Sequence, residues 1–172
     1  FMTRISEICA EDSRNMAKYI ILRRHVTFFK EGEECEHFEE PDEVAVWIPG
    51  SKTDQSMQGV YRSHFSSGEE LCVVTALAEW MQATAWVALE EPLFAVPHAT
   101  GELVVLTRQA VADSFKAAAV QTGVPACDIS THSARIGGAT ALLHCGEGES
   151  VAVAGRWSSD CFRRYTRWTR HL

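Results

Sequence analysis

The last quarter of the chain gathers side chains that could hold a phosphate group. His132 and Arg135 are three positions apart, so their side chains share one face of a predicted helix. Both lie in the first turn of that helix, where free backbone N–H groups and the helix dipole favour an anion. Further along, Trp157 can donate only its indole N–H, and Tyr165 lies among arginines. These residue types and spacings are compatible with an anion-binding site.

Each of these residues also has a purely structural explanation. A histidine and an arginine at a helix start are common as a solvated surface pair. Phe162, Tyr165 and Trp168 recur every three residues, which is typical of an aromatic stripe packed on a core. Trp157, after Gly155, could pack at a turn. Taken one by one, the residues leave the structural and the functional interpretation open.

The elements that must position these residues begin with β-structure. Residues 19–29 and 43–50 are rich in β-forming residues, and the acidic segment 31–43 predicts the loop of a hairpin between them. Residues 60–65 predict a third strand. The spacing of apolar residues near the N-terminus predicts a helix over residues 3–12.

The second half of the chain has a helical pattern. Residues 71–86 place five apolar side chains on one face: Leu71, Val74, Leu77, Ala78 and Met81. Two further helices are predicted, one from a Thr107 cap to Gly123 and one from a Thr131 cap to Gly146. A short helical turn at 149–154 should end at Gly155. A last helix should run from a cap at Ser158 or Ser159 through Trp168. The predicted fold class is therefore α+β, a small antiparallel sheet of three strands with a mainly helical core.

Charge is unevenly distributed along the 172 residues. The net charge is −7, but residues 31–43 carry eight acids and neither lysine nor arginine. The remainder holds 16 basic and 15 acidic residues, and the segment 156–172 holds five arginines against Asp160 alone. Such a basic end permits a polyanion partner and is also typical of a solvated helix face. We expect the acidic segment to be a solvated loop.

The six cysteines are scattered, which favours an intracellular, reducing compartment. Cys35 and His37 have no second ligand pair nearby, so the spacing does not favour a zinc site. No apolar run approaches membrane-spanning length, and residues 1–12 lack the basic start and apolar middle of a secretory signal. We therefore expect neither a metal nor a membrane partner.

The order of the C-terminal motifs favours the functional interpretation of these residues over the structural one. "THSARIGGATAL", then "GRWSS", then "FRRYTRW" resembles the C-terminal half of the tyrosine recombinase (phage-integrase-like) family, whose pattern is H-x-x-R, G-x-[HW] and a tyrosine on a following helix. The tryptophan variant is most similar to recombinases of eukaryotic tyrosine-recombinase retrotransposons, which would place the protein in the nucleus. Upstream, "FMTRISEI" supplies Arg4 and "IPGSKTDQ" supplies Lys52, at the places where the family has an arginine and a hairpin lysine.

The resemblance implies roles for six residues in cutting double-stranded DNA without a cofactor. Tyr165 would attack the scissile phosphate and form a 3′-phosphotyrosyl link. Arg4 and Arg135 would grip its oxygens, and Lys52 would be the general acid. His132 would bond the phosphate or manage the tyrosine proton, and Trp157 would donate to an oxygen. The DNA-backbone contacts expected from the basic end are Arg156, Arg163, Arg164 and Arg167.

The resemblance also implies partners and limits. Family members carry an N-terminal helical domain and act as tetramers on DNA, so we expect a homo-oligomer and interpret residues 1–172 as an N-terminally truncated catalytic domain. Two alternatives remain open. One is a type IB topoisomerase-like enzyme that relaxes DNA by the same chemistry, and the other is an inactive DNA-binding remnant of a mobile element.

Overall fold

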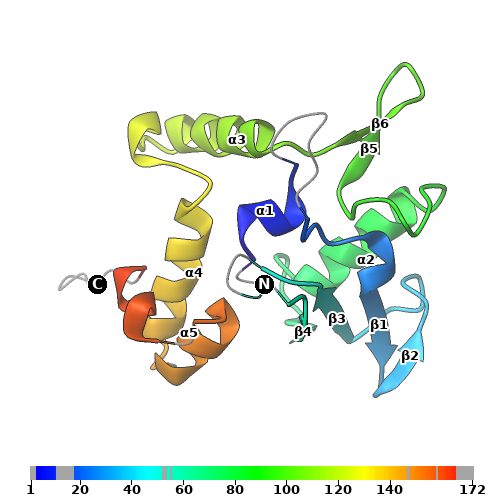
Figure 1. Cartoon of the computed structure of the whole chain (residues 1–172), viewed down its shortest axis with the longest axis horizontal. Helices are drawn as coiled ribbons and strands as arrows, with labels where there is room; N and C mark the ends of the chain where they lie inside the picture. Colours follow the sequence, from blue (N-terminus) through cyan, green and yellow to red (C-terminus); the bar gives the residue numbers. More distant parts are fainter. Residues whose placement is uncertain are drawn as a thin grey trace. The chain divides into compact units, whose positions relative to one another are not determined.

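The computed structural model describes residues 3–10, 18–51, 54, 56–146, 148–157 and 159–165 (Figure 1). The chain divides into two compact units. We call Ser6–Leu106 the sheet unit, and Phe1–Ile5 with Thr107–Leu172 the helical unit. The sheet unit has 18 acidic and 7 basic residues, a net charge of −11, and the helical unit has 5 acidic and 9 basic residues, a net charge of +4. The elements of both units, helices and antiparallel strands, confirm the α+β class.

The sheet unit is built on a four-stranded antiparallel sheet, so the prediction of three strands was wrong. The strands are β1 (Val26–Lys30), β2 (Glu33–Cys35), β3 (Glu43–Ile48) and β4 (Val60–Phe65), in the order β2-β1-β3-β4. The additional strand β2 lies inside the acidic segment that we expected to be a loop. Glu31 and Gly32 both have positive φ, which is typical of a two-residue hairpin turn, and they fold β2 back onto β1.

A helix and a second hairpin complete this unit. In α2 (Val73–Ala83) four of the five predicted face residues are buried, which confirms that face. Leu71 is 95% exposed, because it precedes the N-cap residue Cys72 and so lies outside the helix. The strands β5 (Ala95–Pro97) and β6 (Leu103–Val105) pair with each other. The apolar centre of the sheet lies at Phe28, Val44, Val46 and Ile48, all buried.

The N-terminal elements are shorter than predicted. The helix expected over residues 3–12 is the single turn α1 (Ile5–Ile8), and residues 11 and 12 lie outside the described part of the chain. In the predicted strand 19–29, residues Arg23–His25 form a 3₁₀ turn (η1) instead, and β-structure begins at Val26. Arg23 accounts for this difference, because it is buried and its guanidinium donates to oxygens at the end of α2.

The helical unit contains α3 (Arg108–Gln121), α4 (Ser133–His144), α5 (Gly148–Gly155), and the 3₁₀ helices η2 (Ala126–Asp128) and η3 (Asp160–Arg164). Thr107 caps α3 through its hydroxyl, which accepts from the Ala110 N–H, as predicted. The Thr131 cap was wrong, because His132 occupies the N-cap position of α4 without a capping side-chain bond. Hydrogen bonds between Ser130 and Ser133 close the turn there.

Glycines end two of these helices, as the sequence predicts. Gly123, with φ of 77°, follows α3, and its N–H and that of Val124 donate to Val120 and Ala119. This pair of bonds is the Schellman motif, in which a left-handed residue closes the helix. Gly146, with φ of 82°, follows the C-cap residue of α4. The last predicted helix is, within the described residues, the short 3₁₀ helix η3, and Trp168 lies outside them.

Candidate functional site

Four of the six residues with predicted catalytic roles contact one another in the helical unit. The ring centroid of Tyr165 lies 4.8 Å from that of His132 and 5.0 Å from that of Trp157. The guanidinium carbon of Arg135 lies 4.5 Å from the Trp157 ring centroid and 6.0 Å from that of Tyr165. We call His132, Arg135, Trp157 and Tyr165 the tyrosine cluster. Its members come from the start of α4 and from the segments that follow α5 and η3.

Arg135 is the buried member of this cluster. It lies in the first turn of α4 with only 6% of its surface exposed. One guanidinium nitrogen donates a hydrogen bond to the carbonyl oxygen of Gly155, the last residue of α5. The guanidinium also stacks over the Trp157 ring, an arrangement that stabilises a cation through the π face. Arg135 therefore joins α4 to the end of α5 and is held in a defined position.

The turn after α5 places Trp157 against Arg135. The N–H groups of Arg156 and Trp157 donate to Val153 at 3.1 Å and to Ala152 at 2.9 Å. These two bonds form the same Schellman motif as at Gly123, but here the left-handed residue is Arg156, with φ of 56°. The chain thus reverses at once, and the indole folds back over the end of the helix that precedes it.

Gly155 is required by this reversal, although its own φ is not left-handed. A Cβ built on Gly155 would overlap ring atoms of Trp157. The sequence identifies Gly155 as a helix stop, which is correct, since α5 ends there. Its second role, as space for the indole ring, was not predicted. The Gly-x-Trp spacing of residues 155–157 is the signal that could have revealed it.

Tyr165 follows η3 directly and is its C-cap residue, with its N–H donating to Phe162 at 2.8 Å. Phe162 lies 6.4 Å from Trp157 between ring centroids. The aromatic-packing interpretation therefore holds in part: Tyr165 and Phe162 both pack on rings. The ring partners of Tyr165 are nevertheless the two residues with which the motif pairs it, and its side chain is only half-buried. A half-buried phenol in contact with a histidine remains accessible for chemistry.

The electrostatics of the cluster favour a neutral histidine. Partial burial lowers the pKa of His132 below its ordinary value, and the positive charges of Arg135 and Arg108 lower it further. Arg108 opens α3, and no pattern in the sequence connects it with the site. The cluster thus combines a cation, an indole N–H and a neutral imidazole beside a phenol. These are groups that can hold a phosphate ester next to a nucleophile.

The other predicted site residues lie as follows. Arg4 belongs to the same unit as the cluster, is half-buried and precedes α1. Lys52 and Arg167 lie outside the described residues. Of the predicted DNA contacts, Arg156 is half-buried and Arg163 is exposed on η3. Arg164 also belongs to η3.

The described residues hold no group of three histidine, cysteine or acidic side chains that could bind a metal ion. They also contain no helix that combines the length and apolar character needed to cross a bilayer. Comparison with family models, with curated proteins and with solved structures finds no match to this chain.

Proposed function

We propose that the chain is the catalytic domain of a tyrosine recombinase, which cuts and rejoins DNA in the recombination or integration of a mobile element. The observation that carries the proposal is the tyrosine cluster itself. Residues up to 33 positions apart, from three separate segments, meet as arginine, histidine, tryptophan and tyrosine in contact. This is the set that the family motif requires, and packing alone does not call for a buried arginine at its centre.

The proposed reaction uses these groups in two reversible steps. The Tyr165 oxygen, after losing its proton, attacks the scissile phosphorus, and the bond from phosphorus to the 5′-oxygen breaks. The 5′-oxygen takes up a proton and leaves as a hydroxyl, and the phosphate stays joined to Tyr165 and the 3′-oxygen. Because the phosphodiester bond energy is kept, a 5′-hydroxyl of another strand can reverse the step and release the tyrosine.

The residues around Tyr165 have complementary roles in this proposal. Arg135 stabilises the charge that grows on the non-bridging oxygens, and Arg4 would be its second cation. Trp157 donates its indole N–H to one of these oxygens. The neutral imidazole of His132 can accept the tyrosine proton, because the pKa of His132 is lowered from its ordinary value. Lys52 as general acid for the 5′-oxygen remains a prediction from the family resemblance.

Charge supports DNA as the substrate. The helical unit, with a net charge of +4, contains the whole tyrosine cluster, whereas the sheet unit carries −11. Binding of DNA depends mainly on neutralising phosphates with lysine and arginine, so the distribution of charge matters more than the total of −7. Arg156 and Arg163 belong to this basic unit and are the backbone contacts that we propose.

The decisive experiment traps the covalent intermediate. The chain is incubated with a library of nicked duplexes, in which the short fragment that carries the new 5′-hydroxyl diffuses away after cleavage. Protein–DNA adducts are then separated under denaturing conditions. We expect an adduct with the native chain and none with Tyr165→Phe, whereas Tyr61→Phe, a change at an exposed tyrosine of β4, should leave the adduct intact. Arg135→Ala should reduce adduct formation by roughly 10³-fold or more.

The same experiment separates the alternatives. DNA binding without an adduct from the native chain would contradict the catalytic proposal and support an inactive DNA-binding remnant. An adduct together with relaxation of supercoiled DNA, but without exchanged strands between paired sites, would support a topoisomerase-like enzyme. Strand exchange between two duplexes would support the recombinase.

A further inference from the structure

The four-stranded sheet has two edges that differ in how well they are protected against pairing with another chain. An edge strand presents unpaired N–H and C=O groups, and proteins commonly guard it with charge, proline or short length. The strand order places β2 at one edge and β4 at the other. Both strands belong to the sheet unit, so the inference below does not depend on the tyrosine cluster.

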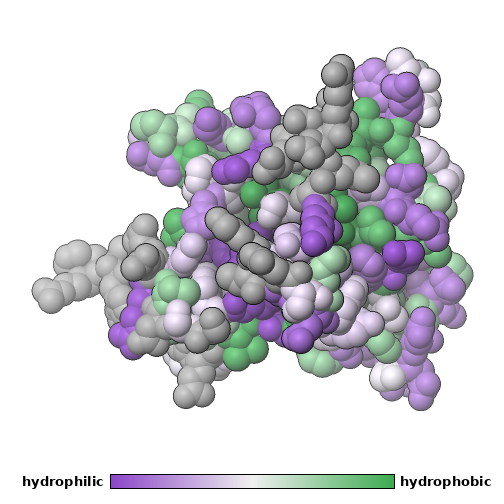
Figure 2. Space-filling view, viewed as in Figure 1, coloured by the Kyte–Doolittle hydropathy of each residue, from purple (hydrophilic) through white to green (hydrophobic). Residues whose placement is uncertain are grey.

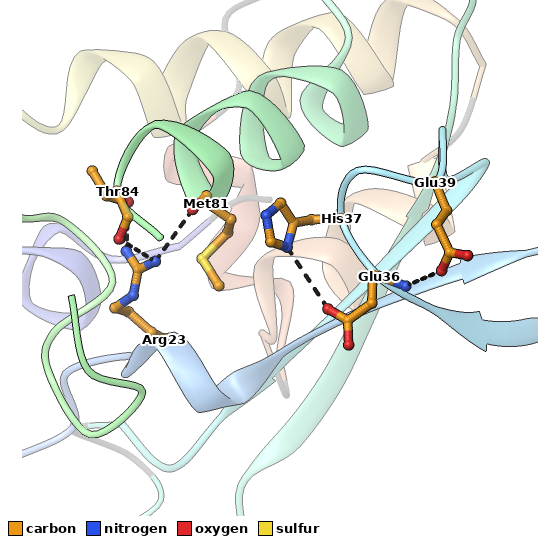
Figure 3. A network of polar contacts seen from close by, with 6 residues as sticks. All are labelled: Arg23, Glu36, His37, Glu39, Met81 and Thr84. Atoms are coloured by element: carbon orange, nitrogen blue, oxygen red, sulfur yellow. Dashed lines mark hydrogen bonds and ion pairs between the residues drawn. The ribbon is translucent and has the colours of Figure 1, made fainter. Parts of the chain in front are cut away.

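The β2 edge carries such protection. β2 has three residues, and two of them, Glu33 and Glu34, are exposed acids. Directly after the strand, the Glu36 N–H donates to the Glu39 carboxylate at 2.7 Å and is thus already used (Figure 3). Figure 2 shows hydrophilic residues gathered over the part of the surface where Figure 1 places the β1–β2 hairpin. Short length and negative charge therefore protect this edge.

The β4 edge carries none of these protective features. β4 (Val60–Phe65) has six residues, and none of them is proline, lysine or an acid. Residues 55–68 also contain no acid, although the sheet unit as a whole has a net charge of −11. Tyr61 is 62% exposed and Phe65 is 72% exposed. Two aromatic rings thus lie in solvent on the edge at which two acidic units can approach with least repulsion.

The backbone groups of alternate β4 residues point away from β3. The β3–β4 register continues to Ser66, which lies opposite Asp42, and the Ser66 N–H donates to the Asp42 carbonyl at 2.6 Å. Since the orientation repeats every two residues, the even-numbered residues of β4 face β3 and the odd-numbered ones face outward. We call these the outer residues: Tyr61, Ser63 and Phe65. Within the described ranges, no backbone group outside the β3–β4 ladder bonds to them.

β4 is complementary to itself in the antiparallel direction. When Ser63 of one copy lies opposite Ser63 of a second copy, Tyr61 of each copy lies opposite Phe65 of the other. Each of these pairs joins outer residues, so each can exchange two main-chain hydrogen bonds. Opposed aromatic side chains stabilise a strand pair. The Tyr61 ring already packs on Trp47 of β3, with 4.7 Å between ring centroids, so the aromatic contacts would continue across the junction.

The other face of β4 is compatible with the same register. There Arg62 of each copy lies opposite His64 of the other. Burial lowers the pKa of His64, so its imidazole is neutral at pH 7. The register therefore does not set two cations against each other at neutral pH.

We propose that two copies of the chain associate through β4, in the register centred on Ser63, so that their sheets form one continuous antiparallel sheet. An interface of one strand from each copy lies at the low end of specific interfaces, below about 1,200 Å² in total. We therefore expect a weak dimer, with a dissociation constant of about 10–100 μM. Because salt screens the repulsion between two acidic units, the dimer should tighten as the salt concentration rises from about 0.05 to 0.5 M.

Sedimentation equilibrium of the chain, freed of nucleic acid, tests the proposal between about 1 μM and 1 mM protein. We expect monomers at the lower end and dimers at the upper end. Phe65→Lys removes the aromatic pair and should weaken the dimer at least about tenfold. Phe38→Lys is the matched control, since Phe38 is 63% exposed, lies outside β4 and undergoes the same change of charge. A chain that stays monomeric at the upper end, or equal losses in both variants, would overturn the proposal.

A disulfide between copies tests the register. Residues of a hydrogen-bonded antiparallel pair have Cα atoms about 5.5 Å apart, which a disulfide can span. Ser63→Cys should therefore form linked dimers on oxidation with glutathione disulfide. Ser67→Cys, at an exposed serine after β4, should form no more of them than the native chain with its own exposed cysteines. Equal linking of both variants, or dimers of Ser63→Cys that do not link, would contradict pairing centred on Ser63.

Discussion

The indole ring of Trp157 occupies the space in which a side chain on residue 155 would begin. A Cβ added to Gly155 would overlap the ring, and the same ring lies beneath the guanidinium of Arg135. The backbone carbonyl of Gly155 in turn accepts a hydrogen bond from Arg135. One glycine therefore sets the positions of two of the four members of the tyrosine cluster.

We expect Gly155→Ala to destabilise the protein by about 2 kcal/mol, because the new methyl group must displace the indole ring or the end of α5. The matched control is Gly137→Ala in the middle of α4, where an added Cβ meets no atom within 4 Å. That change should stabilise the helix by about 0.5–1 kcal/mol, because alanine has the higher helix propensity. Urea unfolding measures both. Equal effects of the two changes would contradict the close packing of Trp157.

The turn at Arg156 carries a separate, measurable strain. Arg156 has φ of 56°, in the left-handed region that side chains disfavour. Arg156→Gly and Arg156→Ala remove the same side-chain interactions, but only alanine keeps the unfavourable backbone. We therefore expect the glycine variant to be more stable than the alanine variant by about 1 kcal/mol. Gly123→Ala, at the equivalent position after α3, should cost a similar amount, and thermal unfolding measures all three.

The pKa of His132 should be lowest when both neighbouring arginines are present. Burial, Arg135 and Arg108 each lower it, so the imidazole should titrate below its ordinary value of 6.5. Arg108→Gln removes one of the two charges and should raise the pKa. Nuclear magnetic resonance titration of the His132 ring measures the change. An unchanged pKa in this variant would show that Arg108 does not act on the site.

Cys72 should make the stability of the sheet unit depend on pH. Hydrogen bonds, first from the Thr75 backbone and then from the Ser67 backbone and the Ser66 hydroxyl, lower the pKa of its thiol from 9.0 to about 5. The folded state therefore releases this proton at lower pH than the unfolded state. The stabilisation that the Cys72 thiolate gives the folded state is complete above pH 9 and is lost as pH falls through about 5. The free-energy difference between the native chain and Cys72→Ser should widen from pH 5 to 9.

Cys9 supplies the control for that prediction. Burial raises the pKa of its thiol to about 11, so the folded state keeps it neutral. Cys9→Ala should cost stability by leaving a cavity, and this cost should stay constant between about pH 5 and pH 8, where the thiol is neutral in both states. Urea unfolding at several pH values measures both variants. A constant cost for Cys72→Ser as well would contradict a stabilised thiolate.

The two helix ends show what local sequence can and cannot predict. Gly123 was predictable, because glycine is the residue that adopts a left-handed end without strain. At Arg156 the same motif forms with an arginine, and no propensity predicts it; the packing of Trp157 on Gly155 accompanies it. The strand β2 was not predicted from the sequence for a related reason. Its residues Glu33–Cys35 have little β propensity, and pairing with β1 across the Glu31–Gly32 turn makes them a strand.

The grouping of the motif residues was more predictable than the elements around them. The motif order named His132, Arg135, Trp157 and Tyr165, and contacts through the Trp157 and Tyr165 rings join all four. It could not name Arg108, which acts on His132 through space and has no sequence relation to it. The buried Arg23 was also missed. A cation in an apolar run is expected to be a strand residue. Its burial is accompanied by hydrogen bonds to the hydroxyl and the carbonyl of Thr84 at the end of α2, which no sequence pattern predicts.

The separation of charge between the two units has a practical consequence for purification. A column chosen for the net charge of −7 would be an anion exchanger, and the chain would be retained through its acidic sheet unit. Under the proposed function, nucleic acid carried over from the lysate would be retained on the same resin and stay bound to the helical unit. Chromatography on immobilised heparin or phosphocellulose, at low salt, selects instead for the basic unit and removes such a contaminant.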